Sequence, residues 1–204
     1  MIARLLTFVA MGLIPIPGAT QSLARDSLVY ELAPSSRLVV RTGKAGLFGF
    51  AGHEHLIQAR EFSGRIVYYP QQPESSRVTV SIATGRLEVL TPPDTAEIRK
   101  VTAAMRTEVL DVAQYSEITL TSQAVEKTGD TLRVQAALTM KSRTRTVPLT
   151  VRVLIGPDTL RATTTFTVRQ SDYGIRPYRG GPGGTVRVAD AVSFDIDAIA
   201  LRRP

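Results

Sequence analysis

The chain has 204 residues, of which 43% are hydrophobic, and this is enough to build the core of one domain. It contains no cysteine, which excludes disulfides, thiol catalysis and thiolate metal sites. The formal net charge is +7, but the basic residues are scattered along the chain rather than clustered. That pattern is typical of a solvated outer face, so no nucleic-acid partner is expected.

The first segment of the chain has the features of a signal peptide. A short basic start precedes an apolar run over residues 5–16, and small residues lead up to Ala24. We therefore predict a cleaved signal peptide at 1–24 and a single domain over 25–204. Cleavage after Ala19, or retention of the segment as an N-terminal anchor, are the alternatives.

No later segment is apolar enough to span a bilayer as a helix. A membrane barrel would carry aromatic girdles, and this chain has no tryptophan. We expect a soluble exported protein, which in a Gram-negative bacterium means the periplasm.

The first half of the remaining chain alternates apolar and polar residues, which predicts β-strands. The clearest period of two lies at 77–82, where valine and isoleucine alternate with arginine, threonine and serine. Glycines at 43–52 suggest a bend or bulge. Further strands are expected at 37–41, 62–69 and 86–91.

The period then changes to that of a helix. Asp94 is a suitable N-cap with Glu97 three residues later. Apolar residues recur at helical spacing at Ile98, Val101, Met105 and Val109. The spacing predicts one amphipathic helix of three to four turns that lies on the sheet.

Strand patterns return and continue almost to the end of the chain. The expected inward faces fall within 118–122, 132–138, 147–153, 160–168 and 186–196. About eight strands predict a closed antiparallel barrel, a size that encloses either packed side chains or one ligand. Ala136, Ala162 and Thr164 are small inward residues, which would suit either a ligand or a tapering barrel.

The basic segment 141–145 lies between two expected strands and is most simply a turn. Attraction to anionic lipid headgroups is a second role for it.

The two histidines, His53 and His55, flank Glu54. On a strand they would share one face with Cα atoms about 6.5 to 7 Å apart. They could chelate a metal together with a third ligand, or hydrogen-bond to a ligand headgroup at the barrel mouth. A hydrolase or isomerase using Glu54 or His53 as base is a third hypothesis.

The sequence offers no signature of hydrolytic catalysis or phosphate binding. No Gly-x-Ser-x-Gly motif occurs, and the glycine-rich segment 180–185 lacks the lysine of a phosphate loop. We expect this segment to form a lid beside the barrel mouth. Tyr173 is expected either to lie in a plain turn or to cover the ligand.

Seven short segments carry motifs that occur together: Phe50–His55, Glu61–Gly64, Met105–Leu110, Tyr115–Ile118, Leu138–Val147, Arg169–Ile175 and Gly183–Asp190. Together they resemble the YceI-like family over about residues 28 to 199. In the 138–147 segment, Lys141-Ser142 stands where His-Gly is usual in that family, which weakens any role for a histidine there.

The resemblance implies an all-β, eight-stranded, lipocalin-like antiparallel barrel with one helix, exported to the periplasm. It implies binding or carriage of a quinone-type or polyprenyl lipid inside the barrel, without catalytic residues, and in some members an association with a membrane b-type cytochrome. We expect a monomer or homodimer. A metal- or redox-linked accessory protein using His53 and His55 is the alternative function. The candidate ligand-binding residues are Phe48, Phe50, His53, His55, Phe62, Phe166, Tyr173 and Ile175.

Overall fold

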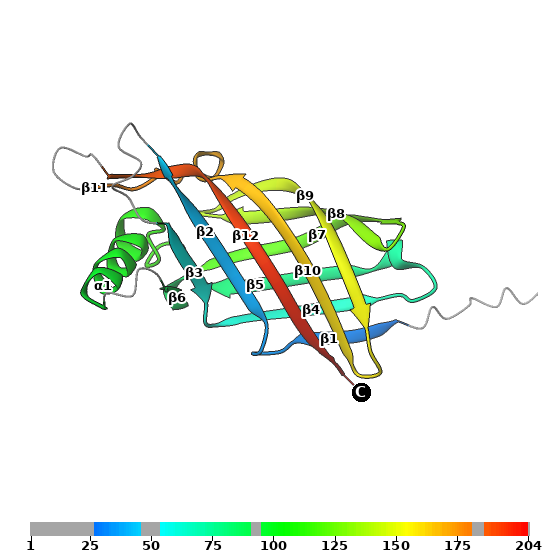
Figure 1. Ribbon diagram of the computed structural model, residues 1–204. Helices are drawn as coiled ribbons and strands as arrows, with labels where there is room; N and C mark the ends of the chain where they lie inside the picture. Colours follow the sequence, from blue (N-terminus) through cyan, green and yellow to red (C-terminus); the bar gives the residue numbers. More distant parts are fainter. Residues whose placement is uncertain (1–26, 46–53, 91–94, 181–185, 204) are drawn as a thin grey trace, which may run out of the picture.

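The alternating segments form one antiparallel sheet in the computed structural model (Figure 1), which describes residues 27–45, 54–90, 95–180 and 186–203. The described strands are β1 (Leu28–Leu32), β2 (Arg37–Ala45), β3 (His55–Ala59), β4 (Phe62–Tyr68), β5 (Arg77–Ala83), β6 (Leu87–Val89), β7 (Glu117–Thr128), β8 (Thr131–Met140), β9 (Arg143–Ile155), β10 (Thr159–Arg169), β11 (Arg179–Gly180) and β12 (Val186–Arg202).

Eight of these strands close into a barrel. The order β1-β4-β5-β7-β8-β9-β10-β12 returns to its start because β12 also pairs with β1, with Leu32 opposite Ala200. Closure leaves no edge strand in this ring. The predicted eight-stranded antiparallel barrel is confirmed.

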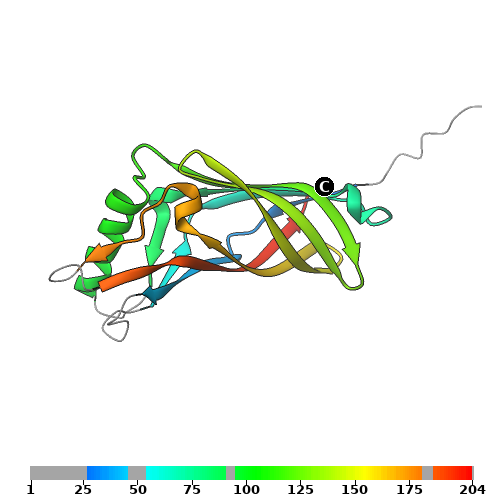
Figure 2. The same ribbon diagram turned by 90° about the horizontal axis from the view of Figure 1, so that it is seen from above.

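The long strand β12 extends beyond the ring. Its last residues pair with β1, whereas its earlier part pairs with β2, and a register shift separates Val188 from Val192. Strands β2, β3 and β6 continue the sheet from there, beside the helix. Figure 2 shows this extension and the helix at the same end of the barrel.

Helix α1 (Thr95–Ala104) continues into a wider π-helical turn, η4 (Met105–Val109). Met105 is buried in the main core cluster, and Val101 and Val109 pack against that cluster. The predicted amphipathic helix is therefore confirmed, while its expected cap Asp94 lies outside the described residues. No helix in the described part of the chain is long and apolar enough to cross a bilayer.

The basic segment 141–145 forms the β8–β9 turn, as expected, with Lys141 and Ser142 at positive φ. The Lys141 ammonium donates to the Val109 carbonyl at 3.3 Å and lies 5.2 Å from the centre of the Tyr115 ring. A cation–π contact of this kind adds to the hydrogen bond. Lys141 thus fastens the turn to the end of η4.

Candidate ligand-binding cavity

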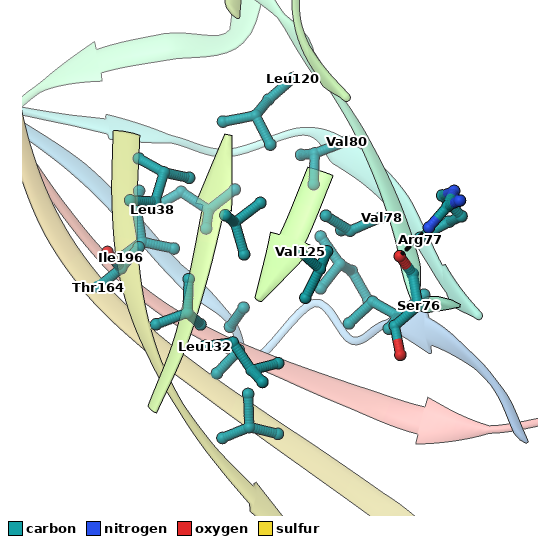
Figure 3. A pocket seen from close by; sticks show the side chains of 18 of the residues that line it. Leu38, Ser76, Arg77, Val78, Val80, Leu120, Val125, Leu132, Thr164 and Ile196 are labelled. Atoms are coloured by element: carbon teal, nitrogen blue, oxygen red, sulfur yellow. Dashed lines mark hydrogen bonds between the residues drawn. The ribbon is translucent and has the colours of Figure 1, made fainter. Parts of the chain in front are cut away.

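The barrel encloses a cavity of about 170 Å³. Its wall is built from the inward-facing positions of the ring strands, which alternate with outward-facing ones because the side-chain period of a strand is two. Val78, Val80 and Ile82 show this on β5, and Val80 lies opposite Leu120 of β7 (Figure 3). The full lining is Leu32, Leu38, Ile66, Tyr68, Ser76, Arg77, Val78, Val80, Ile82, Ile118, Leu120, Val125, Leu132, Val134, Leu138, Leu149, Val151, Val153, Leu160, Ala162, Thr164, Phe166, Phe194, Ile196 and Ala198.

Three polar side chains in this lining, those of Thr164, Ser76 and Arg77, are hydrogen-bonded to the protein itself. Thr164 Oγ1 donates to the Thr150 carbonyl at 2.9 Å, and Ser76 Oγ accepts from the Tyr69 amide at 3.1 Å. The Arg77 guanidinium donates to carbonyls of residues 74–76, and in Figure 3 it points away from the aliphatic side chains. The remaining surface is aliphatic and aromatic, which suits a hydrocarbon and offers little to a polar ligand.

A second apolar cavity, of about 100 Å³, adjoins the first near the helix. Met105, Val109 and Leu110 contribute to its wall from η4 and the residue that follows it. Five residues line both cavities, so the two follow one another along the barrel interior. These shared residues are Leu38, Ile82, Ile118, Phe194 and Ile196.

Of the small residues expected inside the barrel, Ala162 and Thr164 line the main cavity. Ala136 is fully buried in the core and lines neither cavity. The barrel is therefore hollow over part of its length and packed with side chains over the rest.

Three of the predicted aromatic and aliphatic contacts lie in or beside the cavities. Phe166 lines the main cavity and Ile175 lines the second one. Phe62 is partly buried and packs against the core cluster, outside both linings.

Tyr173 lies in the short helical turn η5 (Gln170–Tyr173) and is only 1% exposed. It belongs to the core cluster and lines neither cavity. Burial raises the pKa of its hydroxyl, and the neighbouring Asp172 carboxylate adds to this effect. The structure thus places Tyr173 within the core beside the second cavity's Ile175.

The histidine region is only partly described. Phe48, Phe50 and His53 lie outside the described residues. His55 begins β3, is partly buried, and donates its backbone N–H to Thr42 Oγ1 at 3.2 Å. No group of three or more potential metal ligands occurs among the residues that the structure places. The roles predicted for the two histidines stay predictions.

Most cavity residues were not singled out from the sequence. Leucine, isoleucine and valine on β5, β7, β8 and β9 form much of the wall, and their alternation marks them as inward-facing. Alternation alone does not distinguish a residue that lines a cavity from one that packs in a core, because both face inward.

Tyr30 was also missed. It is fully buried and packs with Ile66 and Leu160, both of which line the main cavity. Its hydroxyl has no hydrogen-bond partner among the described residues. The pKa of the nearby Tyr68 is raised, first by burial and second by Tyr30.

A closed eight-stranded barrel with an apolar interior defines a lipocalin-like protein, the architecture in which a barrel holds one small ligand. Residues 30–200 match the model of the YceI-like domain, and the chain belongs to this family.

Curated relatives include "Protein YceI" of Salmonella arizonae and of Salmonella paratyphi B, each 27% identical over 95 residues. That match spans 47% of this chain and 47% of each relative, about half their length.

Solved structures with the same fold include Burkholderia cenocepacia BcnA, with a TM-score of 0.66 at 16% identity, covering 82% of this chain and 98% of that one. A polyisoprenoid binding domain from Saccharophagus degradans has a TM-score of 0.62 at 13% identity, covering 87% and 100%. A Campylobacter jejuni YceI protein has a TM-score of 0.57 at 14% identity, covering 72% and 85%.

Proposed function

We propose that this protein binds an isoprenoid or similar amphiphilic lipid, of the quinone or polyprenyl type, inside the barrel and carries it in the periplasm. The main observation behind the proposal is the aliphatic and aromatic wall of the main cavity, in which Thr164, Ser76 and Arg77 are hydrogen-bonded to the protein. The fold shared with a polyisoprenoid binding domain supports it.

The energetics favour a hydrocarbon tail. An apolar cavity of about 150 Å³ stays dry and takes up apolar ligands, and the main cavity is of this size. Each methylene moved from water into such a wall contributes about 0.8 kcal/mol. A branched isoprenoid tail that extends from the main cavity into the second one would gain this contribution along its length.

The first test is native mass spectrometry and lipid extraction of protein purified from its own periplasm. We expect a bound lipid of defined mass. A protein that carries no extractable lipid and takes up neither a long-chain quinone nor a polyprenol when offered them would contradict the proposal.

A matched pair of variants assigns the lipid to the cavity. Ala162→Phe places a ring in the main cavity, whereas Thr165→Phe places one on the exposed outer face of the same strand. We expect Ala162→Phe to lower lipid occupancy several-fold and Thr165→Phe to leave it unchanged. Equal occupancy in the two variants would place the lipid elsewhere.

Export rests on the signal-peptide pattern over residues 1–24. Cell fractionation with N-terminal sequencing of the mature protein tests it, and we expect a periplasmic chain that begins at Arg25. Co-purification from solubilised membranes tests the association with a b-type cytochrome.

A further inference from the structure

The large hydrophobic side chains that are strongly exposed in the described residues gather at one place. They are Leu154, Ile155 and Leu201, which are 61%, 47% and 50% exposed. Leu154 and Ile155 end β9, and Leu201 lies next to the last residue of β12. Single exposed leucines are normal on a protein surface, but a group at one end of a fold points to an interaction site.

The strand register brings the three residues together. Strand β10 lies between β9 and β12, with Ile155 opposite Leu160, and Leu201 opposite Thr159. Leu154 lies opposite Arg161 one position further along β10. Because side chains alternate between the two faces of a strand, Leu154 and Leu201 lie on the outer face with Arg161, whereas Ile155 lies on the cavity side with Leu160. All three residues lie near the turn that joins β9 to β10, at one end of the barrel. We call this group the aliphatic tip.

Arginines surround the aliphatic tip. Arg161 and Arg203 are held by Asp197 and Glu31. Arg152 and Arg202 are exposed, and no acidic side chain in the described ranges forms an ion pair with either of them. Two cationic groups thus stand beside apolar ones without an acidic partner, an arrangement suited to phosphate groups above a hydrocarbon layer.

The aliphatic tip is at the end of the barrel away from the helix (Figure 1). It also adjoins the main cavity, because Val153, two residues before Ile155 on the same face of β9, and Leu160, opposite Ile155, belong to the cavity wall. The basic turn at Lys141–Arg145 begins β9 at its other end, so the length of this strand separates the two features.

We propose that the aliphatic tip docks on an anionic lipid bilayer and presents this end of the barrel cavity to the membrane. Leu154 and Leu201 enter the boundary between headgroups and acyl chains, while Arg152 and Arg202 contact lipid phosphates. The benefit of such docking, direct exchange of a lipid, rests on the proposed function. The docking itself does not.

The size of the patch favours a bilayer over a second copy of the chain. A stable protein interface buries about 800 Å² on each partner, far more than three side chains provide. A bilayer requires no complementary surface, because each inserted aliphatic group contributes separately and each arginine adds about 1 kcal/mol near anionic headgroups.

Flotation with vesicles tests the proposal, using vesicles of phosphatidylcholine alone and vesicles with equal parts of phosphatidylcholine and phosphatidylglycerol. We expect binding to the mixed vesicles, about tenfold or more weaker binding of Leu154→Ser/Leu201→Ser, and weaker binding of Arg152→Gln/Arg202→Gln that is lost first as salt rises. The matched control is Arg145→Gln, in the basic turn at the other end, which should bind like the wild type.

Thermal unfolding of each variant confirms folding, which exposed substitutions should leave intact. Equal flotation of wild type and Leu154→Ser/Leu201→Ser would overturn the proposal, as would loss of flotation in Arg145→Gln alone. A concentration-dependent dimer that the serine variant abolishes, without vesicle binding, would instead assign the tip to self-association. Extractable lipid is measured in parallel, so an empty barrel that still floats contradicts the proposed function and not the docking.

Discussion

Phe166 on β10 and Phe194 on β12 lie opposite each other in register and stack with ring centroids 4.7 Å apart and planes 4° from parallel. Phe166 lines the main cavity, and Phe194 lines both cavities. The stacked pair therefore marks the place where the two cavities meet.

This pair should show energetic coupling. Stacked aromatic rings contribute about 0.5–1.5 kcal/mol beyond the area that they bury. In a double-mutant cycle of Phe166→Leu and Phe194→Leu, measured by urea unfolding, we expect a coupling energy in this range. As a control, Phe62→Leu combined with Phe194→Leu should be additive, and coupling there of the same size would contradict an effect specific to the stack.

Gly64 should not tolerate a side chain. A Cβ added there would lie 2.6 Å from Leu32 Cδ1 and 3.1 Å from the Thr79 carbonyl oxygen. We expect Gly64→Ala to lower the free energy of unfolding by about 1–3 kcal/mol. In a protein that already carries Leu32→Ala, the loss caused by Gly64→Ala should be smaller, because the nearest contact of the added Cβ is the leucine side chain. Gly85→Ala, where an added Cβ meets nothing within 4 Å, is the control.

The Tyr30 hydroxyl is buried without a partner among the described residues, which costs stability. Tyr30→Phe removes this group and keeps the ring, so we expect a gain of about 1 kcal/mol in urea unfolding. The pKa of Tyr68 should fall towards its ordinary value in this variant, yet stay above it, because burial is the larger cause of its shift. A less stable Tyr30→Phe protein would indicate that the hydroxyl has a partner.

The raised pKa of Tyr68 also predicts a loss of stability at alkaline pH. Above about pH 10 the unfolded chain releases the phenolic proton first, so the free energy of unfolding falls as pH rises towards the folded-state pKa. In Tyr68→Phe the fall should be less steep. Identical alkaline profiles for the two proteins would contradict this assignment.

Asp190 should fasten η5 to β12. Its carboxylate accepts from the Ser171 amide at 2.8 Å and from the Ser171 hydroxyl at 2.6 Å, and these bonds lower its pKa. We expect Asp190→Ala to cost about 1 kcal/mol at neutral pH. The wild type should lose this contribution as pH falls from about 4 through the lowered folded-state pKa. The variant lacks this acid-dependent loss, and Asp158→Asn on the β9–β10 turn serves as control.

Substitution of His53 and His55 distinguishes the proposed lipid-binding function from the metal- or redox-linked alternative. If His53 and His55 contact a lipid headgroup, His53→Ala/His55→Ala should weaken lipid binding by about three- to tenfold, because a hydrogen bond contributes about 0.5–1.5 kcal/mol. Metal content, measured by elemental analysis, should be equally negligible in both proteins. Metal retained by the wild type alone would favour the metal- or redox-linked accessory role.

The sequence by itself determined the strands, the helix and the family. Apolar residues two apart, such as Val78 and Val80, predict a strand with one buried face, while Val101 and Met105 four apart predict a helix. Both patterns are local, because each depends on the backbone geometry of a few residues.

Tertiary structure alone decided which strands close the barrel and where it is hollow. Leu32 meets Ala200 across nearly the whole chain, and no local pattern encodes that pairing. Likewise Ala136 is packed and Ala162 faces a cavity, although both are small inward residues. Whether a site is packed or hollow depends on the side-chain volumes that strands far apart in sequence bring to it. These strands meet only when the barrel closes.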